Sequence, residues 1–331
     1  MLGRFVALII AMSSTVAIAQ PVTLKLSFFS SDRSHLYLSG IKPFVDAVNL
    51  EGKGRVQIEP YLSGRLGNLE QLSQAIRDGV VDIGYVIPPY ERAIFSDATV
   101  VELPGMYKDA AEATRVFWWL LERDRLRGFA DFLVIGAFAS EPESIHLRPP
   151  VATLADLKDK IVRANNPVEV QVLQRLGAKP SIVAINLAAQ AISAGEIDGA
   201  YAPLVPMIEF GIGRVAQFHY LLRTSCVPQI LLMNRKKFES LPSDVQELIR
   251  RYSGQWLVET YIRINNAVVQ REMDGLLADP RRTVVFPSEA DMKTADEVFK
   301  KVVDGFAAQS AHNADLVETA RSAAKILSSN K

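Results

Sequence analysis

Two kinds of apolar spacing alternate along the first hundred residues. Apolar side chains recur at every second position in 22–27 and 56–61, which predicts two β-strands. Between them, residues 34–49 carry apolar side chains at helical spacing. A second helix, opening near Asn68, and a third strand over 81–85 complete a β-α-β-α-β order. This order predicts a doubly wound α/β sheet.

The rest of the chain continues the mixture of helices and short strands. Its spacing predicts a helix over 112–125, strands over 132–138, 160–163 and 230–233, a helix over 167–176, and two terminal helices within 291–328. Pro149 and Pro150 should stop regular structure, and we expect the chain to cross there between two lobes. A helical pattern from Ser243 to about Leu277 exceeds an ordinary globular helix and would brace both lobes.

Two stretches, 74–85 and 190–201, have nearly the same pattern. Each predicts a helix end, a glycine at its C-terminus, a short strand, and a tyrosine where the strand ends. Ligands of open α/β sheets bind outside the carboxyl ends of strands, so two such lobes would enclose a cleft. The alternative is that helix–glycine–strand units are simply common in α/β proteins.

The N-terminus has the pattern of a secretory signal peptide. Arg4 supplies a positive charge, residues 5–12 are apolar, and 17–19 have the small-x-small form of a cleavage site. We therefore expect residues 1–19 to be removed after Ala19 and the protein to be exported to the periplasm. The alternative for this run is a buried first helix.

Composition narrows the class of partner. The 331 residues have 37 basic and 37 acidic side chains, so removing Arg4 with the leader leaves a net charge of −1. Neutral bulk charge gives no reason to expect a nucleic acid partner. Cys226 is the only cysteine, so no internal disulfide forms, and we expect this thiol to be a small buried hydrophobe.

Several segments, in this order, resemble the solute-binding proteins of TRAP transporters (bacterial extracellular solute-binding protein family 7). They are SGRLG at 63–67, DGVVD at 78–82, LADLKDKIVR at 154–163, LGAKP at 176–180, AGEIDG at 194–199 and MNRKKFESLP at 233–242. Together they cover most of the chain after the leader. Their order and spacing carry the resemblance more than any single segment does.

The resemblance implies a two-lobed α/β periplasmic binding protein, a Venus-flytrap fold with a long helix spanning both lobes. We expect lobe I to comprise 20–144 and 228–262, and lobe II 145–227 and 263–331. The family usually binds organic acids, holds the ligand carboxylate with the arginine at the position of Arg163, and docks on a membrane permease. It implies no enzyme activity, cofactor or metal.

This chain departs from the family pattern at several pocket positions. Glu143 stands near the place of a frequent second arginine, and Arg148 follows a few residues later. Ile185 replaces a common aromatic residue, and Ala202-Pro203 replaces a polar Asn-Pro pair. The pocket should therefore be less polar and carry one positive charge fewer. We expect a ligand with one carboxylate and an apolar or aromatic body, in place of a dicarboxylate or sugar acid.

A guanidinium matches a carboxylate in a two-pronged contact, which independently favours Arg163 as the ligand holder. Its alternative role is a surface salt bridge with Asp156 or Glu169. Among the other candidates, aromatic side chains would flank the ligand body and Glu143 would accept a hydroxyl or amine. The expected ligand-binding set is Arg163, Tyr85, Tyr201, Phe29, Glu143, Asn166 and Gln229.

Two other functional classes stay open. The same cleft would serve a periplasmic protein that presents its ligand to a sensor or receptor, and sequence does not separate this from transport. A hydrolase lacks any nucleophile motif. The Gly-x-Gly-x-x-Ala match at 211–216 lacks a clear preceding strand, and the four histidines show no metal-ligand spacing. His35 lies in a loop that faces the expected cleft.

Overall fold

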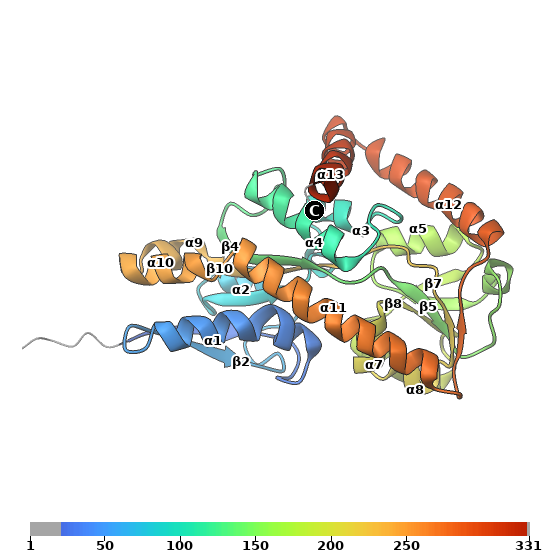
Figure 1. Ribbon diagram of the computed structural model, residues 1–331, viewed down its shortest axis with the longest axis horizontal. Coiled ribbons are helices and arrows are strands. Elements are labelled where there is room, and N and C mark those ends of the chain that lie inside the picture. Colours follow the sequence, from blue (N-terminus) through green and yellow to red (C-terminus); the bar gives the residue numbers. More distant parts are fainter. Residues whose placement is uncertain (1–20, 330–331) are drawn as a thin grey trace, which may run out of the picture.

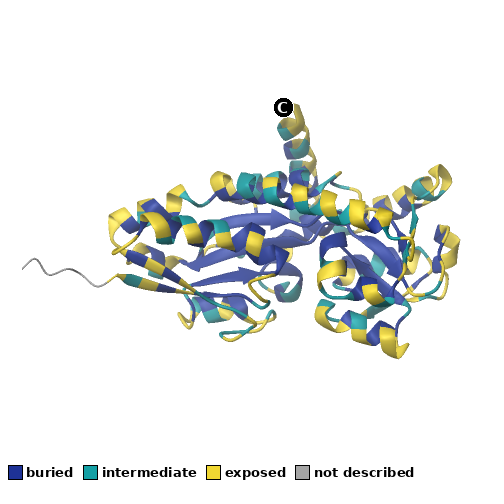
Figure 2. Cartoon of the chain, turned by 60° about the horizontal axis from the view of Figure 1, so that its bottom comes forward, coloured by how far each residue is buried: buried dark blue, intermediate teal, exposed yellow. Residues whose placement is uncertain are grey.

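A computed structural model describes residues 21–329, and the expected signal peptide lies outside them. Two separate β-sheets form the cores of two lobes that lie end to end (Figure 1). In Figure 2 each sheet is a buried layer between partly exposed helices. The sequence therefore predicts the two-lobed α/β class correctly.

The first lobe is built on a five-stranded sheet in the order β2-β1-β3-β10-β4. Its strands are β1 (Val22–Ser27), β2 (Val56–Tyr61), β3 (Ile83–Val86), β4 (Phe132–Ala139) and β10 (Pro228–Asn234). The first three run parallel, and β10 is antiparallel to both of its neighbours. Its helices include α1 (Lys42–Glu51), α2 (Leu72–Arg77), α3 (Thr99–Glu102), α4 (Ala110–Glu122), α9 (Arg235–Glu239) and α10 (Ser243–Arg251).

The second lobe has a six-stranded sheet in the order β11-β9-β5-β8-β6-β7. Its strands are β5 (Ser144–Leu147), β6 (Ile161–Ala164), β7 (Lys179–Ile182), β8 (Gly199–Ala202), β9 (Phe218–Tyr220) and β11 (Thr283–Val285). Its helices include α5 (Pro167–Arg175), α6 (Ile185–Ala194), α7 (Leu204–Glu209) and α8 (Ile212–Val215). Because β8, β6 and β7 run parallel, the carboxyl ends of β6 and β8 lie at the same edge of the sheet, where Arg163 of β6 and Pro203 after β8 line the site.

Two extended segments join the lobes side by side. Residues 140–143 lead from β4 to β5, and residues 221–227 lead back from β9 to β10. Backbone hydrogen bonds tie them together, from Ser140 N to Val227 O (3.0 Å) and from Glu143 N to Ser225 O (2.8 Å). The expected crossing at Pro149 and Pro150 was wrong, because this pair follows β5 and lies wholly within the second lobe.

The expected helix from Ser243 to Leu277 is two helices. After α10, Gly254 adopts a non-helical conformation with φ 62° and ψ −131°, and its N–H donates to Ile135 O of β4 (2.7 Å). This bond replaces the helical one, so the chain turns before α11 (Gln255–Ala278) begins. At 24 residues, α11 is about 36 Å long. It packs on α4 and β4 of the first lobe and on α7 of the second (Figure 1).

The last two helices divide between the lobes. Helix α12 (Glu289–Ala307) packs on α5, with Phe299 in the core of the second lobe. Helix α13 (Ala311–Ser329) instead packs on α4 and contributes Leu316 and Ala320 to the core of the first lobe. The expected assignment of all of 263–331 to the second lobe therefore differs for α13, whose apolar face is buried against α4.

No helix among the described residues has the length and apolarity needed to cross a membrane.

Candidate functional site

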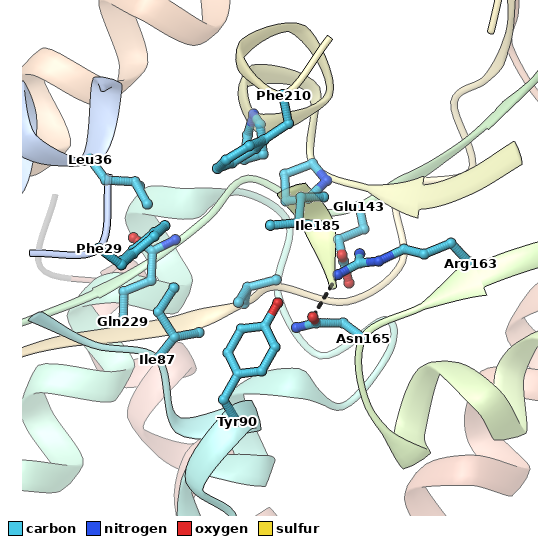
Figure 3. Close-up of a pocket in the computed structure, with 13 residues that line it drawn as sticks. Phe29, Leu36, Ile87, Tyr90, Glu143, Arg163, Asn165, Ile185, Phe210 and Gln229 are labelled. Atoms are coloured by element: carbon cyan, nitrogen blue, oxygen red, sulfur yellow. Dashed lines mark hydrogen bonds between the residues drawn. The ribbon is translucent and has the colours of Figure 1, made fainter. Parts of the chain in front are cut away.

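A cavity lies where the two lobes meet, and it encloses about 420 Å³ of empty space, part of it open to solvent. Side chains of both lobes and of the two joining segments line it (Figure 3). The lining residues are Phe29, Leu36, Ile87, Tyr90, Glu143, Arg163, Asn165, Ile185, Pro203, Pro206, Phe210, Val227 and Gln229. Nine of these thirteen are apolar or aromatic, so the cavity suits a largely apolar molecule with few polar groups.

Arg163 is the cation of this cavity. It lies near the end of β6, and only 2% of its surface is exposed. Its Nε donates to Val183 O (2.8 Å), its Nη1 to Tyr201 O (2.9 Å) and its Nη2 to Asn165 Oδ1 (2.6 Å). A guanidinium has five N–H groups, so these bonds leave one N–H on each Nη atom, with the Tyr90 hydroxyl and a ligand as their acceptors. The protein thus fixes the fork through neutral acceptors alone.

Glu143 lies beside Arg163 at the polar end of the cavity, on the segment that joins β4 to β5 (Figure 3). Both its carboxyl oxygens are buried and accept no hydrogen bond from any described N–H or hydroxyl group, but a side-chain hydrogen bond links this carboxyl group with that of Glu169. Burial raises the pKa of Glu143 well above its usual range, and the nearby Glu169 carboxylate raises it further, against the opposing effect of Arg163. The site therefore holds two buried acids that are hydrogen-bonded to each other, which requires a proton on one of them.

The residues that follow β6 hold Asn165, one of the hydrogen-bond partners of Arg163, in place. Asn166 caps α5, with its Oδ1 accepting from Val168 N (2.8 Å) and Glu169 N (3.0 Å). Glu169 accepts from Asn165 N and from Asn166 Nδ2, both at 2.6 Å. These bonds orient Asn165 toward Arg163. The expectation that Asn166 lines the cavity is corrected, because its side chain is used by the helix cap.

The opposite end of the cavity is mainly apolar, with Phe29 and Leu36 beside the amide of Gln229 (Figure 3). The Tyr85 hydroxyl donates to Gln229 Oε1 (2.7 Å), which fixes the amide so that its nitrogen faces the cavity. Tyr85 itself does not line the cavity, since its ring is fully buried next to Phe28 and Phe138. Its expected contact with the ligand is therefore replaced by a supporting role behind Gln229.

Tyr201 does not line the cavity either, contrary to expectation. Its ring is fully buried, and its hydroxyl bonds to Thr224 Oγ1 of the returning segment. Only its carbonyl oxygen contributes, by holding Arg163 Nη1. The repeated strand-end tyrosines thus occupy equivalent positions behind the site, where each supports a polar lining residue.

Sequence reasoning missed several lining residues. Tyr90 follows two prolines just after β3, at a strand end, and this position was a usable signal. Asn165 directly follows β6 and offered a similar one. Phe210 lies between α7 and α8, two short helices that apolar spacing did not predict. Burial raises the pKa of Tyr90, while Arg163 acts in the opposite direction.

A wider groove adjoins the cavity on its outer side. Its lining includes Ser30, Ser63 and Asn186, and it shares Phe29, Tyr90, Ile185 and Phe210 with the cavity. These four side chains therefore stand between the inner space and the outer groove. Two belong to each lobe, so a change in the spacing of the lobes would open or close this boundary.

Other polar groups of interest lie elsewhere. His35 is buried and its Nε2 bonds to Asn265 Oδ1 (2.7 Å), so it does not line the cavity. Cys226 is free and buried, as expected. Within residues 21–329, no three His, Cys, Asp or Glu side chains are grouped closely enough to hold a metal ion.

Comparison with known protein families gives one match across most of the chain. The model of the bacterial extracellular solute-binding proteins, family 7, covers residues 29–310. A solute-binding protein of Sulfitobacter sp. (strain NAS-14.1) is 26% identical over 247 residues, which are 72% of this chain and 74% of the relative.

Solved structures of TRAP periplasmic solute-binding proteins share the fold. One from Rhodoferax ferrireducens T118, in complex with copurified benzoate, is 27% identical with a TM-score of 0.82, covering 93% of this chain and 99% of that one. Another, from Haemophilus influenzae RdAW with bound L-gulonate, is 18% identical with a TM-score of 0.80, covering 91% and 99%. Proteins of this fold thus bind both aromatic and sugar acids.

Proposed function

Because the chain belongs to family 7 of the bacterial extracellular solute-binding proteins, we propose that it captures an organic acid anion in the cavity between its lobes and delivers it to a TRAP membrane permease. This role places the protein in the periplasm and requires no cofactor or metal. It is a binding and transport function without turnover of the ligand.

One observation carries the proposal: a buried guanidinium with an N–H group left for a ligand stands at one end of a mainly apolar cavity. A buried cation without a carboxylate bonded to it favours an anion. Arg163 is bonded to two carbonyls and an amide, all neutral acceptors. It is therefore preorganised for an acid, and its fork matches a carboxylate in a bidentate contact.

The lining favours a monocarboxylate with an apolar or aromatic body. A ligand held at Arg163 would extend past Ile185 and Ile87 toward Phe29 and Phe210. The hydroxyl groups of a sugar acid would find few partners along these walls, because only Gln229 offers a polar group at the far end. The benzoate copurified with the Rhodoferax ferrireducens protein agrees with this ligand class.

Hinge closure supplies the binding mechanism. The ligand would touch residues of both lobes at once only when they are close together, so binding would shift the population toward the closed form. The joining segments 140–143 and 221–227 are the natural hinge. A permease that recognises the closed surface would then accept only the loaded protein.

The test is calorimetric titration with benzoate, mandelate and L-gulonate against the wild type, Arg163→Ala and Arg163→Lys. Loss of two charge-assisted hydrogen bonds should weaken binding of the preferred acid by at least about 100-fold in Arg163→Ala. Arg163→Lys keeps the charge but loses the fork, so it should fall between the two. Circular dichroism verifies that each variant is folded.

Arg148→Ala is the matched control, because Arg148 is exposed and does not line the cavity. Its affinity should equal that of the wild type. Unchanged affinity in Arg163→Ala, or a clear preference for L-gulonate over both aromatic acids, would contradict the proposal.

A further inference from the structure

Two acidic side chains lie close to the single arginine of the cavity, although an anion site needs none. Arg163 is the only cationic side chain in its lining, while Glu143 lines the same end and Glu169 lies behind it. Only 1% of Glu143 and none of Glu169 is exposed. A ligand carboxylate held by Arg163 would thus be a third carboxyl group around a single guanidinium.

This charge count bears directly on how an anion can bind. With both glutamates ionised, the loaded site would carry a net charge of −2 in a place shielded from water. Like charges a few ångströms apart in such a place do not all stay ionised, and one group takes up a proton instead. The question is which of the three carboxyl groups holds it.

Hydrogen bonding separates the two glutamates. Glu169 accepts two N–H groups, from Asn165 and Asn166, and lies in the first turn of α5, where the helix favours negative charge. Glu143 accepts no hydrogen bond from any described residue. Burial raises the pKa of both groups, but these hydrogen bonds favour the ionised form of Glu169 over that of Glu143, so the proton belongs on Glu143.

The remaining groups around Glu143 do not change this balance. Glu102 also acts on it, but its charge is matched by Arg92 (2.7 Å). The other neighbouring ionisable groups are Glu141 on the same segment, Tyr201 of β8, Cys226 of the returning segment and Tyr90 beside Arg163, and burial raises the pKa of each. None of them brings a positive charge to the site.

We propose that Glu143 is a neutral carboxylic acid in the loaded protein and donates its O–H to the Glu169 carboxylate, so that only one of the two buried glutamates opposes the anion that Arg163 holds. This inference rests on the proposed function, since it needs an anion at Arg163. The proton stays on Glu143 throughout. Where the empty protein has Glu143 ionised, one proton enters from solution with each anion. The site thereby selects monoanions, because a second ligand carboxylate would find neither a cation nor a further proton donor.

The key variant is Glu143→Gln, which keeps the size and a hydrogen-bond donor of the neutral acid and cannot ionise. The probe is whichever of benzoate and mandelate gives the larger rise in melting temperature with the wild type. Its Kd is measured from about pH 5.5 to 8.5. If binding requires a proton on Glu143, the affinity falls by up to about tenfold for each pH unit above the pKa of Glu143. Infrared difference spectra of the loaded protein report a protonated carboxyl group directly.

We expect Glu143→Gln to bind the probe within about threefold of the wild type at the acidic end and with no pH dependence. We also expect the carbonyl band of a protonated carboxyl group in loaded wild type near neutral pH, and its loss in Glu143→Gln. Glu91→Gln is the control. Glu91 is a buried acid of the first lobe that accepts from Ser73 N (3.1 Å) and does not line the cavity, so its pH profile should match the wild type.

Two results would overturn the inference. One is a loss of affinity of more than about tenfold in Glu143→Gln at every pH, which would mean that the ligand pairs with an ionised Glu143, as an amine does. The other is the same protonated-carboxyl spectrum in loaded wild type and Glu143→Gln. Both are distinct from failure of the proposed function, which shows as unchanged affinity in Arg163→Ala.

Discussion

At the scale of single residues, a buried histidine pair sets how the second lobe responds to acid. His146 Nε2 bonds to Ala202 O (3.2 Å), His146 Nδ1 lies 2.9 Å from His219 Nδ1, and Arg282 Nη1 lies 3.3 Å from His219 Nε2. A carbonyl only accepts and an arginine only donates. The one arrangement that fits is two neutral rings, with His219 Nδ1–H donating to His146 Nδ1.

Burial therefore holds both rings neutral. It lowers the pKa of His146 to about 4 and that of His219 to about 3, with Arg282 adding to the shift. The unfolded chain takes up these protons near pH 6.5 and the folded chain does not. The contribution of the pair to stability is complete above about pH 6.5 and is lost as the pH falls toward 4. Burial raises the pKa of Glu143, and that of Glu169 to about 7, and these shifts act in the opposite direction, so the effect of the histidine pair is best isolated by a variant.

We predict that His219→Gln gains stability relative to the wild type as the pH falls from about 7 to 5, by up to about 2 kcal/mol. Glutamine can still donate to His146 and accept from Arg282, but it takes up no proton. Urea unfolding of both proteins at several pH values gives the difference. A difference that stays constant with pH would mean that the imidazole of His219 is not held neutral by the fold.

The residues of the site show what sequence can and cannot reach. The resemblance directed attention to Arg163, and a departure from the family pattern singled out Glu143; both line the cavity. Tyr85 and Tyr201 were located at the right strand ends, but their rings turn into the cores. The direction of a side chain at a strand end depends on neighbours that are distant in sequence, here Phe138 for Tyr85 and Thr224 for Tyr201. The local sequence pattern does not identify these neighbours.

At the scale of elements, the break before α11 is a feature that apolar spacing could not reveal. The helical pattern continues from Ser243 through Leu277, yet the chain leaves the helix at Gly254 to bond β4. That bond comes from tertiary structure. Added atoms at this position would also collide, because a Cβ on Gly254 would lie 2.9 Å from the Trp118 ring.

Gly254→Ala should therefore lower the free energy of unfolding by about 1–3 kcal/mol, because alanine is strained at this positive φ and meets Trp118. Gly275→Ala is the matched control within α11. A Cβ there meets nothing within 4 Å, so the change should stabilise the helix by up to about 1 kcal/mol. Chemical denaturation of both variants measures the contrast. Equal effects at the two positions would contradict the strained turn.

At the scale of the whole molecule, the lobes are joined by more than the two extended segments. Helix α11 packs on both, and the turn between α12 and α13 links a helix of the second lobe to one of the first. Apolar spacing predicted the helices themselves but not their partners, since either lobe could bury the apolar face of α13. Any closing motion has to be accommodated at α11 and at this turn as well as at the hinge.

The divided lining predicts how the molecule responds to a ligand. Arg163 belongs to the second lobe and Phe29 to the first, so an acid that touches both adds to the direct contact from His35 N to Glu209 Oε2 (3.1 Å) and draws the lobes together. Small-angle X-ray scattering should show a smaller radius of gyration when a saturating aromatic acid is added to the wild type, and no change in Arg163→Ala. The same radius for loaded and empty wild type would mean that the lobes are already closed without ligand. The access route through the outer groove, bounded by Tyr90 and Phe210, would then have to open by local movement of side chains.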